Sequence, residues 1–165
     1  MTDGDKTTGA VPVAGGRPPL SMKGRALRLL AQREHSRTEL ERKLRAHEQH
    51  EGELSHALDA LQAKGFINDE RVAESVVHRR ANKLGANRVK AELQAKGLDD
   101  AVVQDAVAAL RATEQERAAE VWRKKFGQPA RDAAERAKQM RFLAARGFAA
   151  EVVRRVVNAS ADEDV

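Results

Sequence analysis

The chain has 165 residues, of which 3% are aromatic, and it contains neither cysteine nor tyrosine. A β-sandwich or β-barrel is excluded because strands are normally filled with β-branched and aromatic side chains, and the lack of cysteine excludes disulfides, thiol nucleophiles and cysteine-ligated zinc. Thirty Lys and Arg residues outnumber 25 Asp and Glu residues, and the resulting charge of +5 favours a polyanionic partner, nucleic acid first.

The two ends of the chain show no sign of regular structure. Residues 1–20 hold four glycines and three prolines without helical periodicity, and residues 159–165 form a short acidic end. The N-terminus lacks the apolar core of a signal peptide, and no apolar stretch is long enough to span a membrane. We therefore expect two flexible tails on a cytoplasmic protein that makes no contact with a membrane.

Good helix formers dominate the stretch between the tails, so an all-α fold is expected. Start and stop signals divide this stretch into nine predicted helices. Their approximate ranges are 22–33, 36–47, 52–64, 69–83, 86–96, 100–111, 114–126, 130–146 and 149–158.

Three predicted helices end in one shared pattern of a leucine, two spacer residues, a base, a glycine and an apolar residue. The pattern occurs at Leu61–Phe66, Leu93–Leu98 and Leu143–Phe148. Glycine after the last helical turn readily adopts the left-handed conformation, and the apolar residue that follows packs back onto the leucine. These segments therefore predict glycine-terminated helices.

Helix starts are marked by capping residues. Ser36–Glu39 has the spacing of a capping box, in which the serine and the glutamate each bond a backbone amide, and Thr113–Glu116 repeats that spacing. Asn68 and Asp99 each follow a glycine stop closely and are good N-caps.

The predicted helices group in threes with a period near fifty residues. Leu44, Leu93 and Leu143 mark the end of the second helix in each group and lie 49 and 50 residues apart. One unit of about 45 residues is too small to bury a stable core alone, so neighbouring units should pack end to end. We expect three tandem three-helix-bundle repeats in an elongated, curved array with a disordered N-terminal tail. The predicted boundaries are 1–20 for that tail, 21–67, 68–111 and 112–158 for the repeats, and 159–165 for the acidic tail.

The sign of the charge alternates along the repeats. Residues 68–97 carry a net charge of +3 and residues 98–110 a net charge of −3. Short three-helix units also suggest a helix-turn-helix protein, whose last helix reads a DNA major groove, but the acidic helix predicted at 100–111 is unsuited to base contacts. Basic stripes at regular spacing favour a long, repetitive partner such as a nucleoprotein filament, and a free-standing DNA-binding transcription regulator is the alternative.

Four motifs, in order along the chain, resemble those of the RecX regulators of the RecA recombinase. They occupy Arg33–Leu44, Gly65–Ala73, Gly85–Gly97 and Arg141–Phe148, and the resemblance extends over about residues 20–158. The resemblance implies three tandem three-helix repeats. It also implies a modulator that binds in the groove of the RecA–DNA filament and suppresses ATP hydrolysis and strand exchange in recombination and repair. We expect a monomer that binds single- and double-stranded DNA weakly and without sequence preference.

Twelve lysine and arginine residues on the predicted basic helices are the candidate contacts to a filament or to DNA. Five of them surround the predicted turn at Gly85, where the amides of a helix terminus would also be available to an anion. A solvated basic face is an equally good interpretation of any single residue. The twelve candidates are Arg33, Arg37, Lys43, Arg79, Arg80, Lys83, Arg88, Lys90, Lys96, Arg123, Lys124 and Lys125.

Neither catalytic residues, nor cofactors, nor metal ions are expected. His47 and His50 lie three residues apart, but no further metal ligand is evident near them. The chain has no glycine-rich phosphate loop, and no serine lies in a nucleophile-like context. Glu34 and Glu39 suit helix capping and ion pairs better than catalysis, and Trp122 suits a core position better than base stacking.

Overall fold

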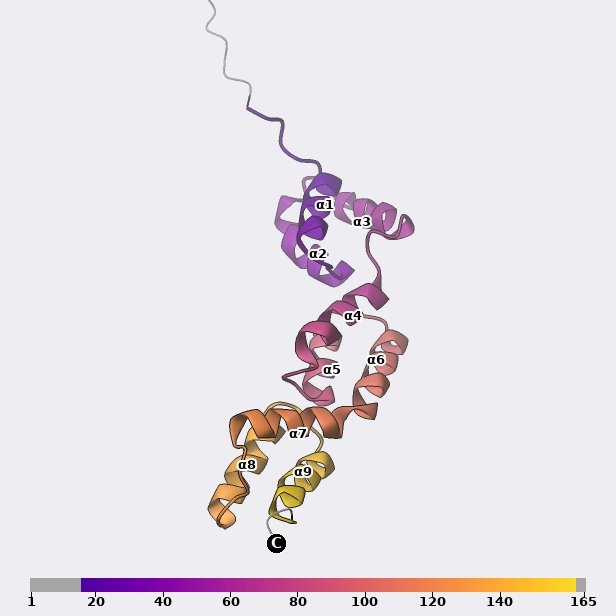
Figure 1. Cartoon of the computed structure of the whole chain (residues 1–165). Coiled ribbons are helices and arrows are strands. Elements are labelled where there is room, and N and C mark those ends of the chain that lie inside the picture. Colours follow the sequence, from indigo (N-terminus) through magenta and orange to yellow (C-terminus); the bar gives the residue numbers. More distant parts are fainter. Residues whose placement is uncertain (1–15, 163–165) are drawn as a thin grey trace, which may run out of the picture.

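The protein is described by a computed structural model, in which residues 16–162 are placed. Within this range the chain forms nine α-helices and one short 3₁₀ helix without any strand, which confirms the all-α fold (Figure 1). In chain order the helices are α1 (Met22–Gln32), α2 (Arg37–Leu44), η1 (Arg45–His47), α3 (Glu53–Ala63), α4 (Asp69–Arg80), α5 (Ala86–Ala95), α6 (Asp100–Ala112), α7 (Glu114–Lys125), α8 (Ala133–Ala145) and α9 (Ala150–Asp162).

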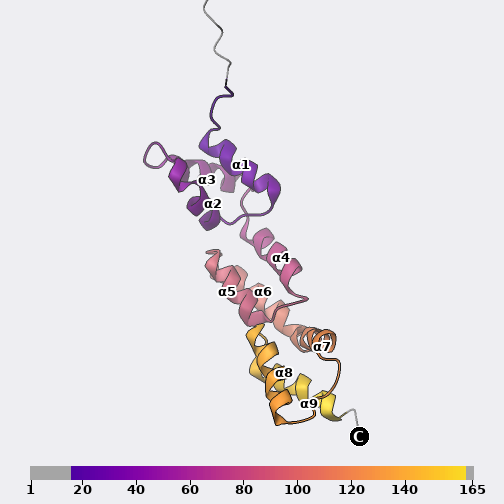
Figure 2. The ribbon, with the colours of Figure 1, turned by 90° about the vertical axis from the view of Figure 1, so that its left-hand side faces the viewer.

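Each consecutive group of three α-helices surrounds its own hydrophobic cluster. Leu40 on α2, Leu93 on α5 and Leu143 on α8 are fully buried at the centres of the three clusters. The three units follow one another along a single axis with a gentle bend, as two perpendicular views show (Figures 1 and 2). The expected elongated, curved array of three-helix units is therefore confirmed.

The C-terminal helix is longer than predicted. It continues to Asp162, so residues 159–162 are helical and do not belong to a frayed acidic tail. Ser160 is buried in its last turns, and the hydroxyl donates a hydrogen bond to the Val157 carbonyl at 2.6 Å. Residues 16–20 are exposed and precede α1 without regular secondary structure. The remainder of the predicted tails, residues 1–15 and 163–165, lies outside the described residues.

The glycine stops are confirmed at all three predicted places. Gly65, Gly97 and Gly147 have φ angles of +80°, +69° and +87°, a region that side chains with a Cβ disfavour. In each case the amide of the next residue donates to the leucine carbonyl five residues earlier, at 2.9–3.5 Å.

The residue after the first glycine does not pack as predicted. Leu98 and Phe148 are buried against their helices, whereas Phe66 is 47% exposed. Ile67, one residue further on, is buried in the first cluster in its place, because the chain turns there from α3 towards α4.

Most of the predicted caps form. The capping box of Ser36 and Glu39 is complete, and Asn68 and Asp99 cap α4 and α6 through their side chains. The box predicted at Thr113 is wrong. Because Thr113 alone separates the end of α6 from the start of α7, it has φ −114° and ψ 7° instead of an extended backbone, and its side chain caps no amide of α7.

The end of α8 lies directly against the start of α5. The Gly85 amide donates to the Arg146 carbonyl at 2.8 Å, and the Asn87 amide donates to the Gly147 carbonyl at 3.1 Å. A Cβ atom added to Gly85 would lie 2.3 Å from the Gly147 backbone. The two backbones are thus in direct contact, with the negative end of one helix dipole facing the positive end of the next.

Two side chains of α7 complete this junction between the second and third units. The Glu114 carboxylate, 2% exposed, accepts a hydrogen bond of 2.7 Å from the Ala86 amide. The Arg117 guanidinium donates hydrogen bonds of 2.8 Å to the carbonyls of Ala81 and Leu84, which follow α4, and of Leu110, near the end of α6. Burial lowers the pKa of Arg117, and the Glu114 carboxylate opposes that shift.

The end of α5 meets the start of α2 in the same direction. A Cβ atom on Gly97 would lie 2.3 Å from the Thr38 Oγ1 atom, and the Lys96 ammonium forms an ion pair with Glu39. Arg42 on α2 donates to the last carbonyl of α5 at 3.4 Å. Helices α8, α5 and α2 therefore form one head-to-tail row along the array.

Glu39 is the charged centre of the junction between the first and second units. Burial opposes its ionisation, but hydrogen bonds from Lys96, from the Ser36 backbone and from Arg33 outweigh that effect and lower the pKa of Glu39 to about 2. The carboxylate therefore stays charged at any pH near neutrality and holds two units together.

The three glycine stops provide a test of the backbone contacts. Gly65→Ala should lower the free energy of unfolding by about 1 kcal/mol, because its left-handed backbone is strained by a Cβ but the space around it is open. Gly97→Ala and Gly147→Ala should each cost roughly 1–3 kcal/mol more, since the added atom overlaps the neighbouring unit. Urea unfolding followed by circular dichroism measures all three, and equal losses would contradict the junction contacts.

Glu39→Gln tests the ion pair through its pH dependence. The pKa of Glu39 in the folded chain lies below its ordinary value of 4.5, so its contribution is complete above pH 4.5 and is lost as the pH falls towards 2. At pH 7 the free energy of unfolding of the variant should be roughly 1–3 kcal/mol lower than that of the parent chain. The difference should shrink as the pH approaches 2, and a difference that is independent of pH would contradict the assignment.

Candidate functional site

Three of the predicted contact residues hold the first unit and its junction together. Arg33 and Lys96 both reach Glu39, the former with an Nη1–Oε2 distance of 3.3 Å. Arg37 bridges α2 and α3 through an ion pair of 2.6 Å with Asp59. These three side chains form ion pairs within the chain and therefore stabilise the array.

Lys43 lies beside a buried histidine. His35 is 1% exposed, its Nδ1 atom is 3.0 Å from the Arg33 carbonyl oxygen, and its Nε2 atom is 3.3 Å from the Lys43 ammonium nitrogen. Burial lowers the pKa of His35, which keeps the ring neutral and leaves Nε2 free to accept a hydrogen bond from Lys43. Lys43, which was predicted to contact a partner, thus bonds the histidine that precedes α2.

The amides at the Gly85 turn are not available to an anion, so that prediction is wrong. The amides of Gly85 and Asn87 donate to carbonyls at the end of α8, and the amide between them donates to Glu114. The end of the neighbouring unit thus occupies the place that an anion would take. The residues near Gly85 could not predict this contact, because Arg146 and Gly147 lie about sixty residues further along the chain.

The five bases around this turn differ in how far they are engaged. Arg80 forms an ion pair of 3.2 Å with a glutamate on α5, Arg88 donates to the last carbonyl of α8 at 2.9 Å, and Arg79 donates to a carbonyl of its own helix. Lys83 and Lys90 are exposed, and neither side chain forms a hydrogen bond or ion pair with any residue in the range 16–162.

The bases at the end of α7 lie on the surface. Arg123 and Lys124 share Glu120 in exposed ion pairs, and the Lys125 ammonium lies 5.5 Å from the centre of the Phe142 ring. Exposed ion pairs of this kind contribute little to stability and exchange readily for contacts with a partner. Trp122, by contrast, is buried in the third cluster, as predicted.

Two exposed bases on α8 were missed among the candidates. Lys138 and Arg141 lie three residues apart on one helix face, and within the described chain neither side chain is hydrogen-bonded or ion-paired. The signal was present in the sequence, since residues 111–147 carry the largest positive charge of any segment. The predicted contacts of the third unit were Arg123, Lys124 and Lys125, all at the end of α7, and none was on α8.

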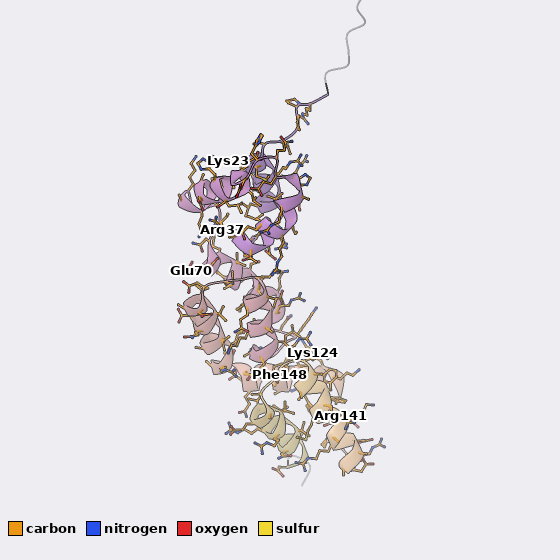
Figure 3. The ribbon with its side chains drawn as sticks, turned by 180° about the vertical axis from the view of Figure 1, so that it is seen from behind. Lys23, Arg37, Glu70, Lys124, Arg141 and Phe148 are labelled. Carbon is orange, nitrogen blue, oxygen red and sulfur yellow. The ribbon has the colours of Figure 1, made fainter. Side chains whose placement is uncertain are left out.

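Exposed bases of the second and third units lie on the middle helices α5 and α8, just after α4 and at the end of α7. Helices α2, α5 and α8 lie on one side of the array, and α3, α6 and α9 lie on the other (Figure 1). Seen from behind, Lys124 and Arg141 point towards one edge of the third unit, whereas Glu70 lies at the opposite edge of the second (Figure 3). We call the following set the basic edge: Lys83, Lys90, Arg123, Lys124, Lys125, Lys138 and Arg141.

The basic edge has the chemistry of a polyanion contact and not of a reaction centre. Its members are flexible, mostly solvated ammonium and guanidinium groups, which position phosphates without reading bases. No cluster of three or more metal-binding side chains occurs among residues 16–162. In the same range, no helix has the length and apolar character needed to cross a membrane.

Comparison with known proteins identifies the family. Residues 68–107 match the description "RecX, second three-helix domain", and residues 112–157 match "RecX, third three-helix domain". Curated relatives named regulatory protein RecX include one from Leptothrix cholodnii, 53% identical over 88% of this chain and 92% of its own length. Another, from Ralstonia nicotianae, is 48% identical over 86% of this chain and 89% of its own length.

A solved structure agrees with this result. The crystal structure of RecX from Lactobacillus salivarius superimposes with a TM-score of 0.71 at 25% identity, over 85% of this chain and 94% of that one. Sequence and fold thus point to the same group of proteins across both matched domains and most of the first. The chain belongs to the RecX family of regulatory proteins.

Proposed function

We propose that the protein is a non-enzymatic modulator of the RecA recombinase. It binds the RecA–DNA filament through the basic edge and thereby restrains ATP hydrolysis and strand exchange in recombination and DNA repair. The observation that carries this proposal is the placement of exposed bases on α5 and α8, which are joined head to tail, and at the neighbouring ends of α4 and α7. Such a row presents charge at several separated points, which suits a long partner built from repeated subunits.

The proposed inhibition works by occupancy. A filament must change shape and exchange strands as it works, and a bound array that contacts neighbouring parts of the filament opposes those movements. The array is suited to this because backbone hydrogen bonds and the close contact of Gly85 with Gly147 join the second and third units, and the Lys96–Glu39 ion pair joins the first and second. No catalytic step is required of the chain.

The alternative, a transcription regulator that reads DNA sequence, finds no support in the third helices. Asp100 and Asp105 are exposed on α6, and their carboxylates would face the phosphates of a duplex. The bases of the basic edge are exposed on α5, α7 and α8 and after α4, where they suit contacts with a phosphate backbone. We therefore propose weak, salt-sensitive binding of a monomer to single- and double-stranded DNA without a preferred site.

Charge reversal on the basic edge tests the proposal. The triple variant Lys90→Glu, Lys124→Glu, Arg141→Glu should lose inhibition of the DNA-dependent ATPase of RecA, because each change removes an exposed cation and adds a repulsive charge. The salt dependence of binding to the filament should flatten at the same time, since fewer counterions are released. Both are measured with purified RecA on single-stranded DNA over a series of salt concentrations.

A matched control changes the same number of charges off the basic edge. Arg28, Lys64 and Arg154 are exposed on or next to α1, α3 and α9, and their joint reversal to Glu alters the net charge equally. This control should keep its inhibition. Loss of inhibition in the control together with full inhibition by the first variant would show that the opposite side of the array binds the filament.

A further inference from the structure

An open groove runs between α4 and α6 on the second unit. It has a volume of about 390 Å³, and its floor includes Val77, Val102 and Ala106, which belong to the edge of the second hydrophobic cluster. The rim carries Glu70 and Glu74 from α4 and Asp105 from α6. We call this feature the acidic groove. Glu70 lies at the edge of the molecule away from Lys124 and Arg141 (Figure 3).

In the third unit the apolar floor of this groove is nearly filled, while a polar hollow of about 540 Å³ remains beside it along α9. Val77 is the ninth residue of α4, and the ninth residue of α7 is Trp122. Ala106 is the seventh residue of α6, and the seventh residue of α9 is Val156. Trp122 and Val156 both line the corresponding space between α7 and α9, which has a volume of about 130 Å³. The groove of the second unit is thus open because smaller side chains occupy its equivalent positions.

The rims of the two grooves also differ. Glu70 and Glu74 on α4 correspond to Gln115 and Ala119 on α7, so the second unit gains two carboxylates at equivalent places. Among residues 16–162, Glu70, Glu74 and Asp105 form no ion pair. An apolar floor between unpaired carboxylates attracts a ligand that is apolar on one face and basic beside it.

Charge and backbone geometry restrict what this ligand is. Nucleic acid is repelled by the rim, and the chain's own residues 1–20 carry two bases and two acids, so they have no net positive charge. The walls are helices whose backbone groups are bonded internally, which leaves no edge for an added strand. An amphipathic helix laid between two helices makes its contacts through side chains alone and fits such walls.

We propose that the acidic groove is a second docking surface, which binds a basic, amphipathic helix of another protein. Aliphatic side chains of that helix enter the space above Val77 and Ala106, and its lysine or arginine residues pair with Glu70, Glu74 and Asp105. The surface is separate from the basic edge, so one array presents two contacts of opposite charge to different partners or to different parts of one assembly.

The experiment uses the full chain and a synthetic helical peptide of about 18 residues, with leucines at i, i+3, i+4 and i+7 and lysines on the flanks. The comparison peptide has the same composition in an order that spreads the leucines around the helix. Backbone amide shifts in NMR spectra report where each peptide binds. We expect the first peptide to shift amides of α4 and α6, around Val77 and Ala106, with an affinity about tenfold higher than that of the second.

Two variants separate the contributions of charge and space. Glu74→Gln with Asp105→Asn should weaken binding about tenfold at low salt, whereas neutralising Glu51 and Glu116, which are exposed elsewhere, should not. Ala106→Val, which places the residue of the third unit in the second, should weaken binding without removing charge. Equal affinity for the two peptides, amide shifts confined to other helices, or full binding by both variants would overturn the proposal.

Discussion

Two close contacts, of Gly147 with the Gly85 backbone and of Gly97 with the Thr38 side chain, place the three units of this protein in one row. Neither contact leaves space for a Cβ atom on the glycine, and the first is reinforced by a pair of amide-to-carbonyl hydrogen bonds. Each hydrophobic cluster stays within its own unit. The direction of one unit relative to the next is thus set by the ends of the middle helices, where opposite helix dipole ends meet, and not by a large apolar interface.

This arrangement divides the basic residues between two tasks. Bases that lie at the junctions, such as Lys96, Arg88 and Arg117, bond carboxylates and carbonyls of the neighbouring unit. Bases away from the junctions, such as Lys90 and Arg141, remain exposed. Fewer bases are therefore available to a partner than the composition of the chain suggests. The spacing of the units determines where these exposed bases lie. Alternation of charge along the repeats separates this edge from the acidic groove.

Features governed by neighbours in sequence could be predicted, and features governed by distant contacts could not. The glycine stops depend on about six consecutive residues, and all three adopt the predicted conformation. The partner of Glu39 is 57 positions away, so composition and spacing gave no sign that Lys96 would be engaged there. Even a local pattern failed at Thr113, because the preceding helix ends too close for its backbone to extend.

The central claim, that head-to-tail junctions make the three units one rigid array, is tested most directly by a distance between the outer units. The chain has no cysteine, so spin labels at His56→Cys on α3 and Ala134→Cys on α8 are the sole thiol sites. The account predicts one narrow distance distribution that does not change with salt and that broadens when Gly85→Val is added, because the new side chain overlaps Gly147. A broad or multi-peaked distribution in the chain with Gly85 intact would contradict it.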